Sequence, residues 1–334
     1  MSSDAHVSRL TFPSKLGFGT GGLGTLYRDV SEREAAGVLA EAYEAGFRYF
    51  DTSPFYGHGL SELRLGSFLR TVPRESVMVS TKAGRYMVPP YGEKVDYGWW
   101  AAPLRLKPVF DYSYNGAMRS LEQSANRIGI TDFDLVYIHD VDRFIHGADF
   151  ERRFDEAVEG CYRALNDLRN GGFIKAVGVG VNGSDVATQF VKACRLDAVM
   201  IANRYTLLDQ SALVDLIPAA KAAGTQIVAA AVFNSGILAA GPESANARYD
   251  YGAPPAEIVN KTKRIQDLCN AHGVPLQAAA IQFPLRNPIV STEVLGMSRF
   301  GRVKQNMEWY RWPISDELWS SLDELLGIEQ EQTA

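Results

Sequence analysis

The segment that sets the pattern of this chain is FRYFDTSPFYGHG, which runs from Phe47 to Gly59. Its first half is an apolar strand that ends at Asp51, and its second half is a loop that presents Tyr56 just before two glycines. An acid at the end of a strand and a tyrosine in the following loop can face one cleft. The same residues also fit a purely structural role, with a buried acid that caps a turn beside a packed aromatic ring. The rest of the chain decides between these two interpretations.

The composition is that of an ordinary globular protein. The chain has 334 residues, 46% hydrophobic and 22% charged, and a formal net charge of −5, which argues against nucleic acid or an anionic membrane as partner. The N-terminal sequence MSSDAHVSRL lacks the apolar core of a signal peptide, and no apolar run approaches the length of a membrane span. Three widely spaced cysteines predict buried free thiols, with no disulfide framework and no metal site. We therefore expect a cytoplasmic protein.

Strand-like and helix-like segments alternate along the chain. Eight short apolar strands are predicted at Lys15–Gly19, Phe47–Asp51, Val77–Lys82, Asp134–His139, Ala176–Val179, Ala198–Asn203, Ile227–Val232 and Ser291–Leu295. Helices are predicted between many of them, at Ser31–Ala45, Ser61–Leu69, Asn115–Ile128, Asp155–Arg169, Ala212–Ala223 and Ile258–His272. Continuously apolar strands are buried on both faces, as parallel strands are.

The economical closure of this pattern is an α/β fold, the (β/α)₈ TIM barrel. We expect one domain over residues 1–334, although length alone would suggest two. An N-terminal β-hairpin that includes Leu10–Phe12 and extra C-terminal helices, the last beginning at Ser315, complete the prediction.

An open, doubly wound α/β sheet is the competing fold. Its G-x-G-x-x-G fingerprint after the first strand is not matched, because GFGTGGLG (Gly17–Gly24) has the wrong spacing. The long gaps, Ala83–Tyr114 and Asn234–Ala256, both follow strands. Loops after the strands form the active face of a barrel, so the gaps predict where a site lies.

Polar residues fall at the carboxyl ends of several predicted strands. They are Asp51, Lys82, His139, Asn203 and, one step beyond its strand, Asn182. Taken singly, each fits an ordinary structural role, such as a solvated strand end or a satisfied core histidine. A barrel gathers strand ends at one mouth, so four suitable groups at corresponding ends predict a joint chemical function.

Together with Tyr56, these groups suit proton transfer beside hydride transfer. A tyrosine hydroxyl titrates near pH ~10, and a nearby Lys82 ammonium is expected to lower this pKa. The Asp51 carboxylate would hold the lysine charged and in place, and a neutral His139 can hydrogen-bond the substrate oxygen. The set moves a proton on or off a carbonyl or alcohol oxygen but supplies no electron acceptor, so a cofactor is required.

Seven motifs in family order resemble the aldo-keto reductase superfamily over nearly the whole chain. They are GFGTGG (Gly17–Gly22), FDTSPFYG (Phe50–Gly57), STKAG (Ser80–Gly84), LVYIHD (Leu135–Asp140), GVGVNG (Gly178–Gly183), ANRYTLLD (Ala202–Asp209) and LGMSRFGRVKQN (Leu295–Asn306). The resemblance implies a (β/α)₈ barrel that binds an extended nicotinamide dinucleotide without a Rossmann fold. It places the catalytic tetrad at Asp51, Tyr56, Lys82 and His139.

The resemblance also implies where the cofactor lies. Asn182 and Asn203 match positions that hold the nicotinamide carboxamide, and backbone N–H groups of the loop Phe233–Leu238 would bind the pyrophosphate. The expected cofactor residues are Gly19, Thr20, Asn182, Asn203, Phe233, Asn234, Ser235, Gly236, Leu238, Gly296, Ser298, Arg302, Gln305 and Asn306, of which the last three match the adenosine site.

Two positions depart from the common family pattern. Val232 or Phe233 stands where many members stack a tyrosine on the nicotinamide, so the stacking residue is open. Gly296 stands where many NADP-preferring members carry a lysine, although Arg302 can still clamp a 2′-phosphate. The loss of one cation weakens such a phosphate site, so NAD is slightly favoured and NADP is the alternative.

Within the superfamily the chain is most similar to bacterial members that act on cyclic hemiacetals. These are the D-threo-aldose (L-fucose or galactose) 1-dehydrogenases and pyridoxal 4-dehydrogenase, and the likeness rests on Asp111–Gly129, Ile138–Arg143 and Val232–Leu238. The implied reaction oxidises a ring hemiacetal to a lactone, with Tyr56 as the base. A reductase of aldehydes or ketones that uses NADPH is one alternative. A cofactor-binding, redox-sensing regulatory subunit is another, against which the intact tetrad argues.

Aromatic residues crowd the loops after the third and seventh predicted strands. Trp99 and Trp100 are the expected substrate contacts, and Tyr86, Tyr91 and Tyr97 share their loop. Such rings can form a platform for a small-molecule carbonyl or hemiacetal substrate, or they can pin the loop to the barrel. Tyr249 and Tyr251 are expected to close over the cofactor. The oligomeric state is not predicted.

Overall fold

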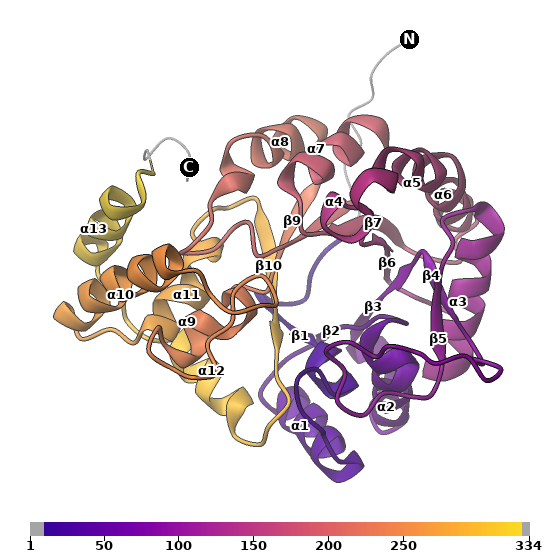
Figure 1. The fold of residues 1–334 in the computed structure, drawn as a ribbon, viewed down its shortest axis with the longest axis horizontal. Coiled ribbons are helices and arrows are strands. Elements are labelled where there is room, and N and C mark those ends of the chain that lie inside the picture. Colours follow the sequence, from indigo (N-terminus) through magenta and orange to yellow (C-terminus); the bar gives the residue numbers. More distant parts are fainter. Residues whose placement is uncertain (1–9, 329–334) are drawn as a thin grey trace.

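The computed structural model describes residues 10–328 and shows a closed barrel of parallel strands (Figure 1). Around the barrel the strands follow the order β1-β10-β9-β8-β7-β6-β3-β2, and every neighbouring pair is parallel. Their bounds are β1 Leu16–Gly19, β2 Tyr49–Asp51, β3 Met78–Ala83, β6 Leu135–His139, β7 Ala176–Val181, β8 Ala198–Ala202, β9 Gln226–Ala230 and β10 Val290–Gly296. The predicted (β/α)₈ barrel is confirmed.

Helices surround the barrel (Figure 1). The larger ones are α1 Glu32–Glu44, α2 Leu60–Leu69, α3 Tyr114–Ile128, α5 Phe150–Glu156, α6 Arg163–Asn170, α7 Ser184–Ala193, α8 Leu216–Ala223, α10 Ala256–Ala271 and α11 Leu276–Leu285. Beyond the last strand lie α12 Arg302–Tyr310 and α13 Asp316–Leu326, the predicted C-terminal extra helices. Ser31 and Ser315 cap α1 and α13 with their side chains, which is why both helices begin where the sequence indicates. Among the residues described, no helix is long and apolar enough to cross a bilayer.

The sequence missed α7 and α11 and part of the geometry before α6. Much of α11 (LQAAAIQFPL) is buried, so it lacks the one-sided apolar stripe that marks a surface helix. The predicted helix over Asp155–Arg169 contains a π-helical segment, Ala157–Tyr162. There Gly160 lies so close to another segment that an added Cβ would meet the Tyr112 carbonyl oxygen at 2.5 Å.

The predicted N-terminal β-hairpin is wrong for Leu10–Phe12, which form no strand. Instead, both Leu10 and Phe12 pack against an interior cluster of the barrel, and the Phe12 ring lies 5.2 Å from the Tyr49 ring. The Gln226 amide donates a hydrogen bond to the Leu10 carbonyl oxygen at 2.7 Å. The segment therefore contacts the barrel mainly through side chains, and residues 1–9 lie outside the described part.

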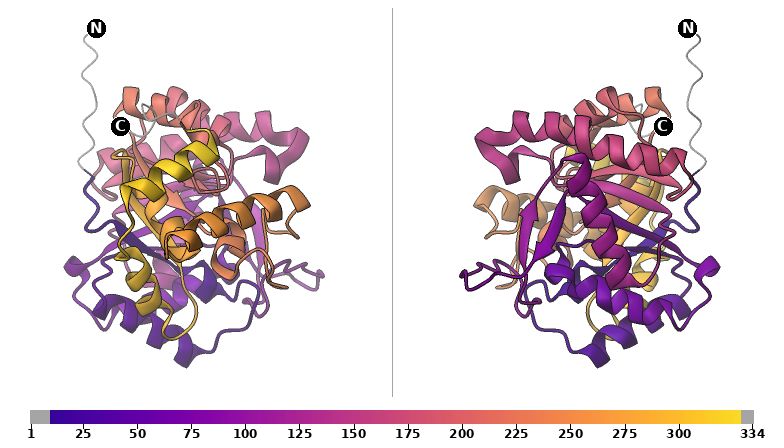
Figure 2. Two further views of the ribbon diagram at one scale, coloured as in Figure 1. Left: turned by 90° about the vertical axis from the view of Figure 1, so that its left-hand side faces the viewer. Right: turned by 90° about the vertical axis from the view of Figure 1, so that its right-hand side faces the viewer.

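A β-hairpin does form in the first long gap. The strands β4 (Arg85–Val88) and β5 (Lys107–Phe110) pair antiparallel and stand beside the barrel (Figure 2). The chain leaves β3 through Gly84, whose φ of 112° is open to glycine, and an added Cβ would meet the Tyr112 ring at 2.4 Å. The second gap holds a 3₁₀ turn, Asn234–Gly236, and the short helix α9, Ile237–Ala240. The three cysteines are buried free thiols, as predicted.

Candidate active site

A cavity of about 410 Å³ opens at the carboxyl ends of the barrel strands. Its walls include Asp51 from the end of β2, Lys82 from β3 and His139 from the end of β6, with Tyr56 from the loop after β2. All four residues of the expected tetrad therefore border one space, although 88 residues separate the first from the last along the chain (51 to 139). The barrel geometry brings them together.

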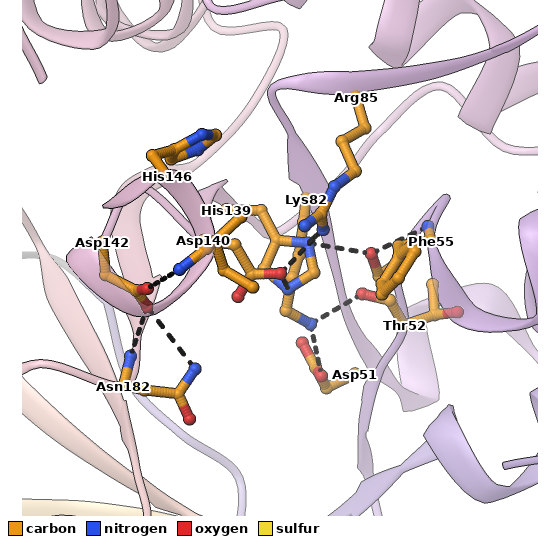
Figure 3. Close-up of polar contacts among 12 residues, drawn as sticks. Asp51, Thr52, Phe55, Lys82, Arg85, His139, Asp140, Asp142, His146 and Asn182 are labelled. Carbon is orange, nitrogen blue, oxygen red and sulfur yellow. Dashed lines mark hydrogen bonds and ion pairs between the residues drawn. The ribbon is translucent and has the colours of Figure 1, made fainter. Parts of the chain in front are cut away.

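Lys82 and Asp51 form a buried ion pair at the base of this group (Figure 3). The Lys82 Nζ lies 2.6 Å from Asp51 Oδ2 and donates a second hydrogen bond to the Thr52 carbonyl oxygen at 2.8 Å. The Ser80 hydroxyl donates to Asp51 Oδ1 at 2.7 Å. Burial raises the pKa of Asp51, and the Lys82 charge opposes this rise. Lys82 is thus fixed in position, with its Nζ 4.8 Å from the centre of the Tyr56 ring.

Tyr56 begins a tight turn that faces a neighbouring loop. Gly57 and His58 have left-handed backbones, with φ of 62° and 55°, and an added Cβ on Gly57 would meet the Gly24 carbonyl oxygen at 2.4 Å. This close approach explains the glycines of the FYGHG motif. The turn leaves the Tyr56 ring on the cavity wall, 6.1 Å from the rings of both His139 and Trp100.

The pKa of Tyr56 is shifted upward, not downward as expected from the sequence. Burial raises it well above its ordinary value, the Asp51 and Asp140 carboxylates raise it further, and the Arg85 guanidinium opposes them. The cost of burying a phenolate here outweighs the effect of nearby cations. The neutral phenol is therefore the favoured form of Tyr56 in this structure.

His139 is held on one ring nitrogen by two neighbours. Its Nδ1 lies 3.2 Å from Ser53 Oγ and 3.3 Å from an Arg85 Nη1, and its Nε2 lies 3.5 Å from Asp140 Oδ2. Burial, and then the charges of Arg85 and Lys82, lower the pKa of His139 well below its usual range. The imidazole is therefore neutral at physiological pH.

The sequence interpretation missed Arg85 and Asp140. Arg85 Nη1 donates to Asp140 Oδ2 at 2.7 Å, and its guanidinium lies 4.1 Å from the Phe55 ring centre and 4.2 Å from that of Phe110. Asp140 also lines the cavity. Both residues adjoin recognised motifs, since Arg85 follows STKAG and Asp140 ends LVYIHD. This position next to the motifs is the sequence signal that could have identified them. The Arg85–Asp140 ion pair itself depends on the β4–β5 hairpin.

At the expected nicotinamide end, two amides meet each other. The Asn203 Nδ2 donates to Asn182 Oδ1 at 3.1 Å, and the Asn234 Nδ2 donates to the Asn203 carbonyl oxygen at 3.1 Å. Asp142 Oδ2 accepts a hydrogen bond from the Asn182 backbone N–H at 3.1 Å and so fixes the position of Asn182 (Figure 3). The expected cofactor residues that line the cavity are Gly19, Asn182, Phe233, Ser235, Gly236 and Gly296.

The remaining expected cofactor residues lie outside the cavity lining. Thr20 is buried and uses its hydroxyl to bind the Asp51 carbonyl oxygen at 2.9 Å, and Leu238 is in the core. Ser298 borders Gly22, where an added Cβ would meet the Ser298 Cβ at 3.0 Å. Arg302 and Gln305 line a separate surface hollow on α12 and share a hydrogen bond of 2.8 Å.

Asn306 fits a role in binding an extended dinucleotide, because it is fully buried and neither polar atom of its amide has a partner among residues 10–328. In the expected pyrophosphate loop, Asn234, Ser235 and Gly236 have positive φ values of 45°, 59° and 122°. The backbone N–H groups of Asn234 and Gly236 already donate to the carbonyl oxygens of Ala231 and Phe233, at 2.8 and 2.9 Å, so the structure gives this loop no free set of phosphate donors at those two positions. The nicotinamide-side residues thus meet at the cavity, and the adenosine-side residues lie on α12.

Aromatic side chains from three loops meet over the cavity. Trp99 stacks on Tyr251 at 4.9 Å with an interplanar angle of 20°, and Phe144 stacks on the same tyrosine at 6.0 Å. The Tyr251 hydroxyl donates to Asn182 Oδ1 at 3.4 Å. Trp99 and Trp100 line the cavity, as a platform requires. Their loop neighbours serve the scaffold or the surface: Tyr86 packs on Arg119, Tyr97 packs on His58, and Tyr91 is exposed.

Comparison with known proteins decides the family. The model of the aldo/keto reductase family matches residues 15–327. A pyridoxal 4-dehydrogenase from Microbacterium luteolum is 41% identical over 318 residues, which cover 92% of each chain. A D-threo-aldose 1-dehydrogenase from Pseudomonas sp is 42% identical over 325 residues, which cover 96% of each. The chain belongs to the aldo/keto reductase family.

Solved structures show the same fold for this aldo/keto reductase. A glycerol dehydrogenase from Gluconobacter oxydans superposes with a TM-score of 0.73 at 21% identity, covering 98% of this chain and 96% of that one. An aldo-keto reductase from Bacillus halodurans, in its holo form, gives the same score and identity and covers 98% and 100%. The protein is accordingly an oxidoreductase, and its cofactor is NAD(H) or NADP(H), since members of the family use nicotinamide dinucleotides.

Proposed function

We propose that this aldo/keto reductase oxidises the ring hemiacetal of a small substrate, either an aldose or a pyridoxal-like compound, to a lactone. One domain, residues 1–334, would carry both cofactor and substrate. The observation that carries the proposal is that Asp51, Tyr56, Lys82 and His139 border one cavity beside the Asn182 amide. The substrate class is supported by the names of the two relatives, which share 41% and 42% of their residues with this chain.

The chemistry divides between the side chains and the cofactor. A nicotinamide dinucleotide, whose carboxamide Asn182 and Asn203 would hold, would supply the hydride acceptor. Tyr56, as the phenolate, would take the proton of the anomeric hydroxyl and become a phenol, while the substrate gains the C=O bond of the lactone. His139 hydrogen-bonds the same oxygen and fixes its orientation. The buried Lys82–Asp51 pair places a cation against the Tyr56 ring, where its charge favours the phenolate that oxidation requires.

The reverse reaction, reduction of an aldehyde or ketone, is the second candidate. The observation that favours it is the raised pKa of Tyr56, which keeps the phenol neutral and ready to donate a proton to a carbonyl oxygen. The same groups serve both directions, because a general acid in one direction is the general base in the other. Cofactor preference then separates the two, since NAD pools favour oxidation and NADP pools favour reduction.

A substrate panel tests this function directly. D- and L-aldoses, pyridoxal, and simple aldehydes and ketones would each be assayed with the oxidised and reduced forms of both cofactors. We expect reduction of NAD with at least one hemiacetal, and the lactone identified by mass spectrometry. Turnover of open-chain aldehydes with NADPH, and of no hemiacetal with either oxidised cofactor, would rule the dehydrogenase out in favour of the reductase.

We infer a preference for NAD from the start of α12. The Glu41 carboxylate of α1 accepts the backbone N–H of Gly301 at 3.1 Å and approaches that of Lys304 at 3.4 Å. These are N–H groups of a helix N-terminus, which otherwise attracts phosphate. The carboxylate satisfies them and adds a negative charge at this helix N-terminus, which disfavours a 2′-phosphate there. Gly296 supplies no cation, and the cations that remain in the hollow beside Arg302 are Arg299 and Lys304.

Replacing Glu41 by glutamine should therefore tighten NADP binding and leave NAD binding unchanged. Loss of a charge at a helix N-terminus corresponds to a change of about 2- to 5-fold in Kd. Quenching of tryptophan fluorescence measures both Kd values without turnover. Glu44→Gln is the matched control, because Glu44 lies on the same helix but is exposed. An NADP affinity that stays unchanged in Glu41→Gln, or rises equally in the control, contradicts this account.

A further inference from the structure

The hydrogen bonds of His139 specify which of its nitrogens carries the proton. An arginine side chain can only donate hydrogen bonds. Because Arg85 Nη1 lies 3.3 Å from His139 Nδ1, that nitrogen has to accept and is unprotonated. The Ser53 hydroxyl, 3.2 Å away, is consistent with this, since its oxygen already accepts the Phe55 N–H at 3.1 Å and its proton is free to donate. A hydroxyl suits either tautomer, so the choice depends on Arg85.

Arg85 is itself held in place by several contacts, and Figure 3 shows it beside His139 and Asp140. Arg85 is 3% exposed, and its guanidinium packs against the rings of Phe55 and Phe110. Nη1 also donates to Asp140 Oδ2 at 2.7 Å. Its backbone carbonyl accepts the Ser120 hydroxyl at 2.6 Å. The guanidinium therefore cannot turn away from His139 without losing an ion pair and two aromatic contacts.

We propose that Arg85 is a positioning residue that holds His139 as the neutral tautomer with its proton on Nε2. The Nε2–H is then the one imidazole donor offered to a substrate oxygen in the cavity. This role rests on the proposed function, because it supplies the hydrogen bond that orients that oxygen. Arg85 also pairs with Asp140, which would otherwise face His139 Nε2, 3.5 Å away, as an unbalanced carboxylate.

The charged groups around His139 set the direction of the effect. Burial lowers the pKa of His139 most, and then the cations Arg85 from β4 and Lys82 from β3 lower it further. Asp140 follows His139 just beyond β6, and Tyr56 faces it from the loop after β2. Removing the Arg85 charge takes away one of the two cations and frees Asp140, so the pKa of His139 rises. Nδ1 can then take up a proton, and the resulting imidazolium would stand beside the Lys82 cation.

Nitrogen-15 NMR of the histidine rings tests the proposal in the wild-type protein, and a substitution serves only to assign the signals. The chain has 5 histidines, and the His139 signals are assigned by their loss in His139→Asn. We expect the neutral tautomer with the proton on Nε2 at neutral pH. A proton on Nδ1 in the wild type, as the other tautomer or as imidazolium, overturns the proposal. Because no turnover is needed, this result is separate from success or failure of the substrate panel.

Two substitutions of Arg85 then test the cause. Arg85→Met keeps an unbranched chain between the two rings but removes donor and charge, and Arg85→Lys keeps both. In Arg85→Met we expect a proton on Nδ1, an acid limb of kcat/KM moved to higher pH, and kcat lowered by up to about 10²-fold. Arg85→Lys should restore the wild-type tautomer and part of the rate. Nδ1 remaining unprotonated in Arg85→Met overturns the proposal.

Arg286→Met is the matched control. Arg286 likewise pairs with a carboxylate, Asp323, at 2.6 Å and packs on an aromatic ring, that of Trp319, at 4.6 Å, but on the outer helices α11 and α13. Its loss should lower stability without moving the His139 signals or the pH profile. A shift of both in the control would show that general loosening, and not the Arg85 contact, governs the tautomer.

Discussion

Tyr56→Phe is expected to lower kcat by about 10²- to 10⁴-fold, the range for losing a general acid–base group, and to leave dinucleotide binding nearly unchanged. The substitution removes only the hydroxyl. The ring contacts with Trp100 and His139, each at 6.1 Å, remain available to phenylalanine. Steady-state turnover and fluorescence titration with cofactor measure the two effects separately.

Tyr27→Phe is the matched control for this substitution. Tyr27 lines the same cavity, and its buried hydroxyl has no hydrogen-bond partner among the described residues, but it is not within the tetrad. We expect near wild-type turnover in that variant. Comparable turnover in Tyr56→Phe and Tyr27→Phe would exclude Tyr56 as the proton carrier.

The same residue determines how the rate depends on pH. Since the pKa of Tyr56 is raised well above its ordinary value, the phenolate is scarce at neutral pH and becomes more abundant as pH rises. Oxidation, which needs the phenolate, should therefore accelerate with pH through the alkaline range, and reduction, which needs the phenol, should slow. Both trends should be absent from the residual activity of Tyr56→Phe.

The fold and the convergence of Asp51, Tyr56, Lys82 and His139 on one cavity were predictable because each depends on a local sequence pattern. Buried parallel strands give continuous apolar runs, and residues at their carboxyl ends are gathered by the barrel whatever the details of packing. Asp51, Lys82 and His139 end such runs, so their convergence follows once the strands are recognised. The family motifs then suggested the roles of Tyr56 and of the cofactor residues, which stay predictions.

What the sequence could not supply depends on packing between distant segments. Arg85 reaches His139 only because the β4–β5 hairpin forms where a structureless loop was expected. The direction of the Tyr56 pKa shift follows from a balance of burial, two carboxylates and Arg85, and motif spacing carries no measure of burial. In the same way, Leu10–Phe12 pack against the barrel interior by tertiary contact, which overrides the strand propensity of the segment.

Lys82→Met is expected to be the most destabilising change in the site, as well as a strongly inactivating one. The lysine and Asp51 side chains are each 2% exposed, and removing one partner leaves a buried carboxylate without its cation. Such a loss costs about 3–5 kcal/mol of unfolding free energy. Lys175→Met is the control, because Lys175 also forms an ion pair of 2.6 Å, with Asp134, but is 72% exposed. Because Lys175 is exposed and Asp134 keeps Arg74 at 2.9 Å, this loss is expected to cost only about 0–1 kcal/mol.

The double variant Asp51→Asn/Lys82→Met separates stability from catalysis. It removes both charges of the pair, so it should recover most of the unfolding free energy lost in Lys82→Met. It should recover no turnover, because the cation beside Tyr56 is still missing.

In Lys82→Met alone, stability should also depend on pH, because the pKa of Asp51 rises further above its unfolded value. Its carboxyl is then tolerated while protonated, and stability falls as pH rises through that pKa. Chemical denaturation at several pH values, with kcat measured in parallel, checks each step. A Lys82→Met variant no less stable than Lys175→Met, or a double variant that regains turnover, would show that this pair neither stabilises the barrel nor assists Tyr56.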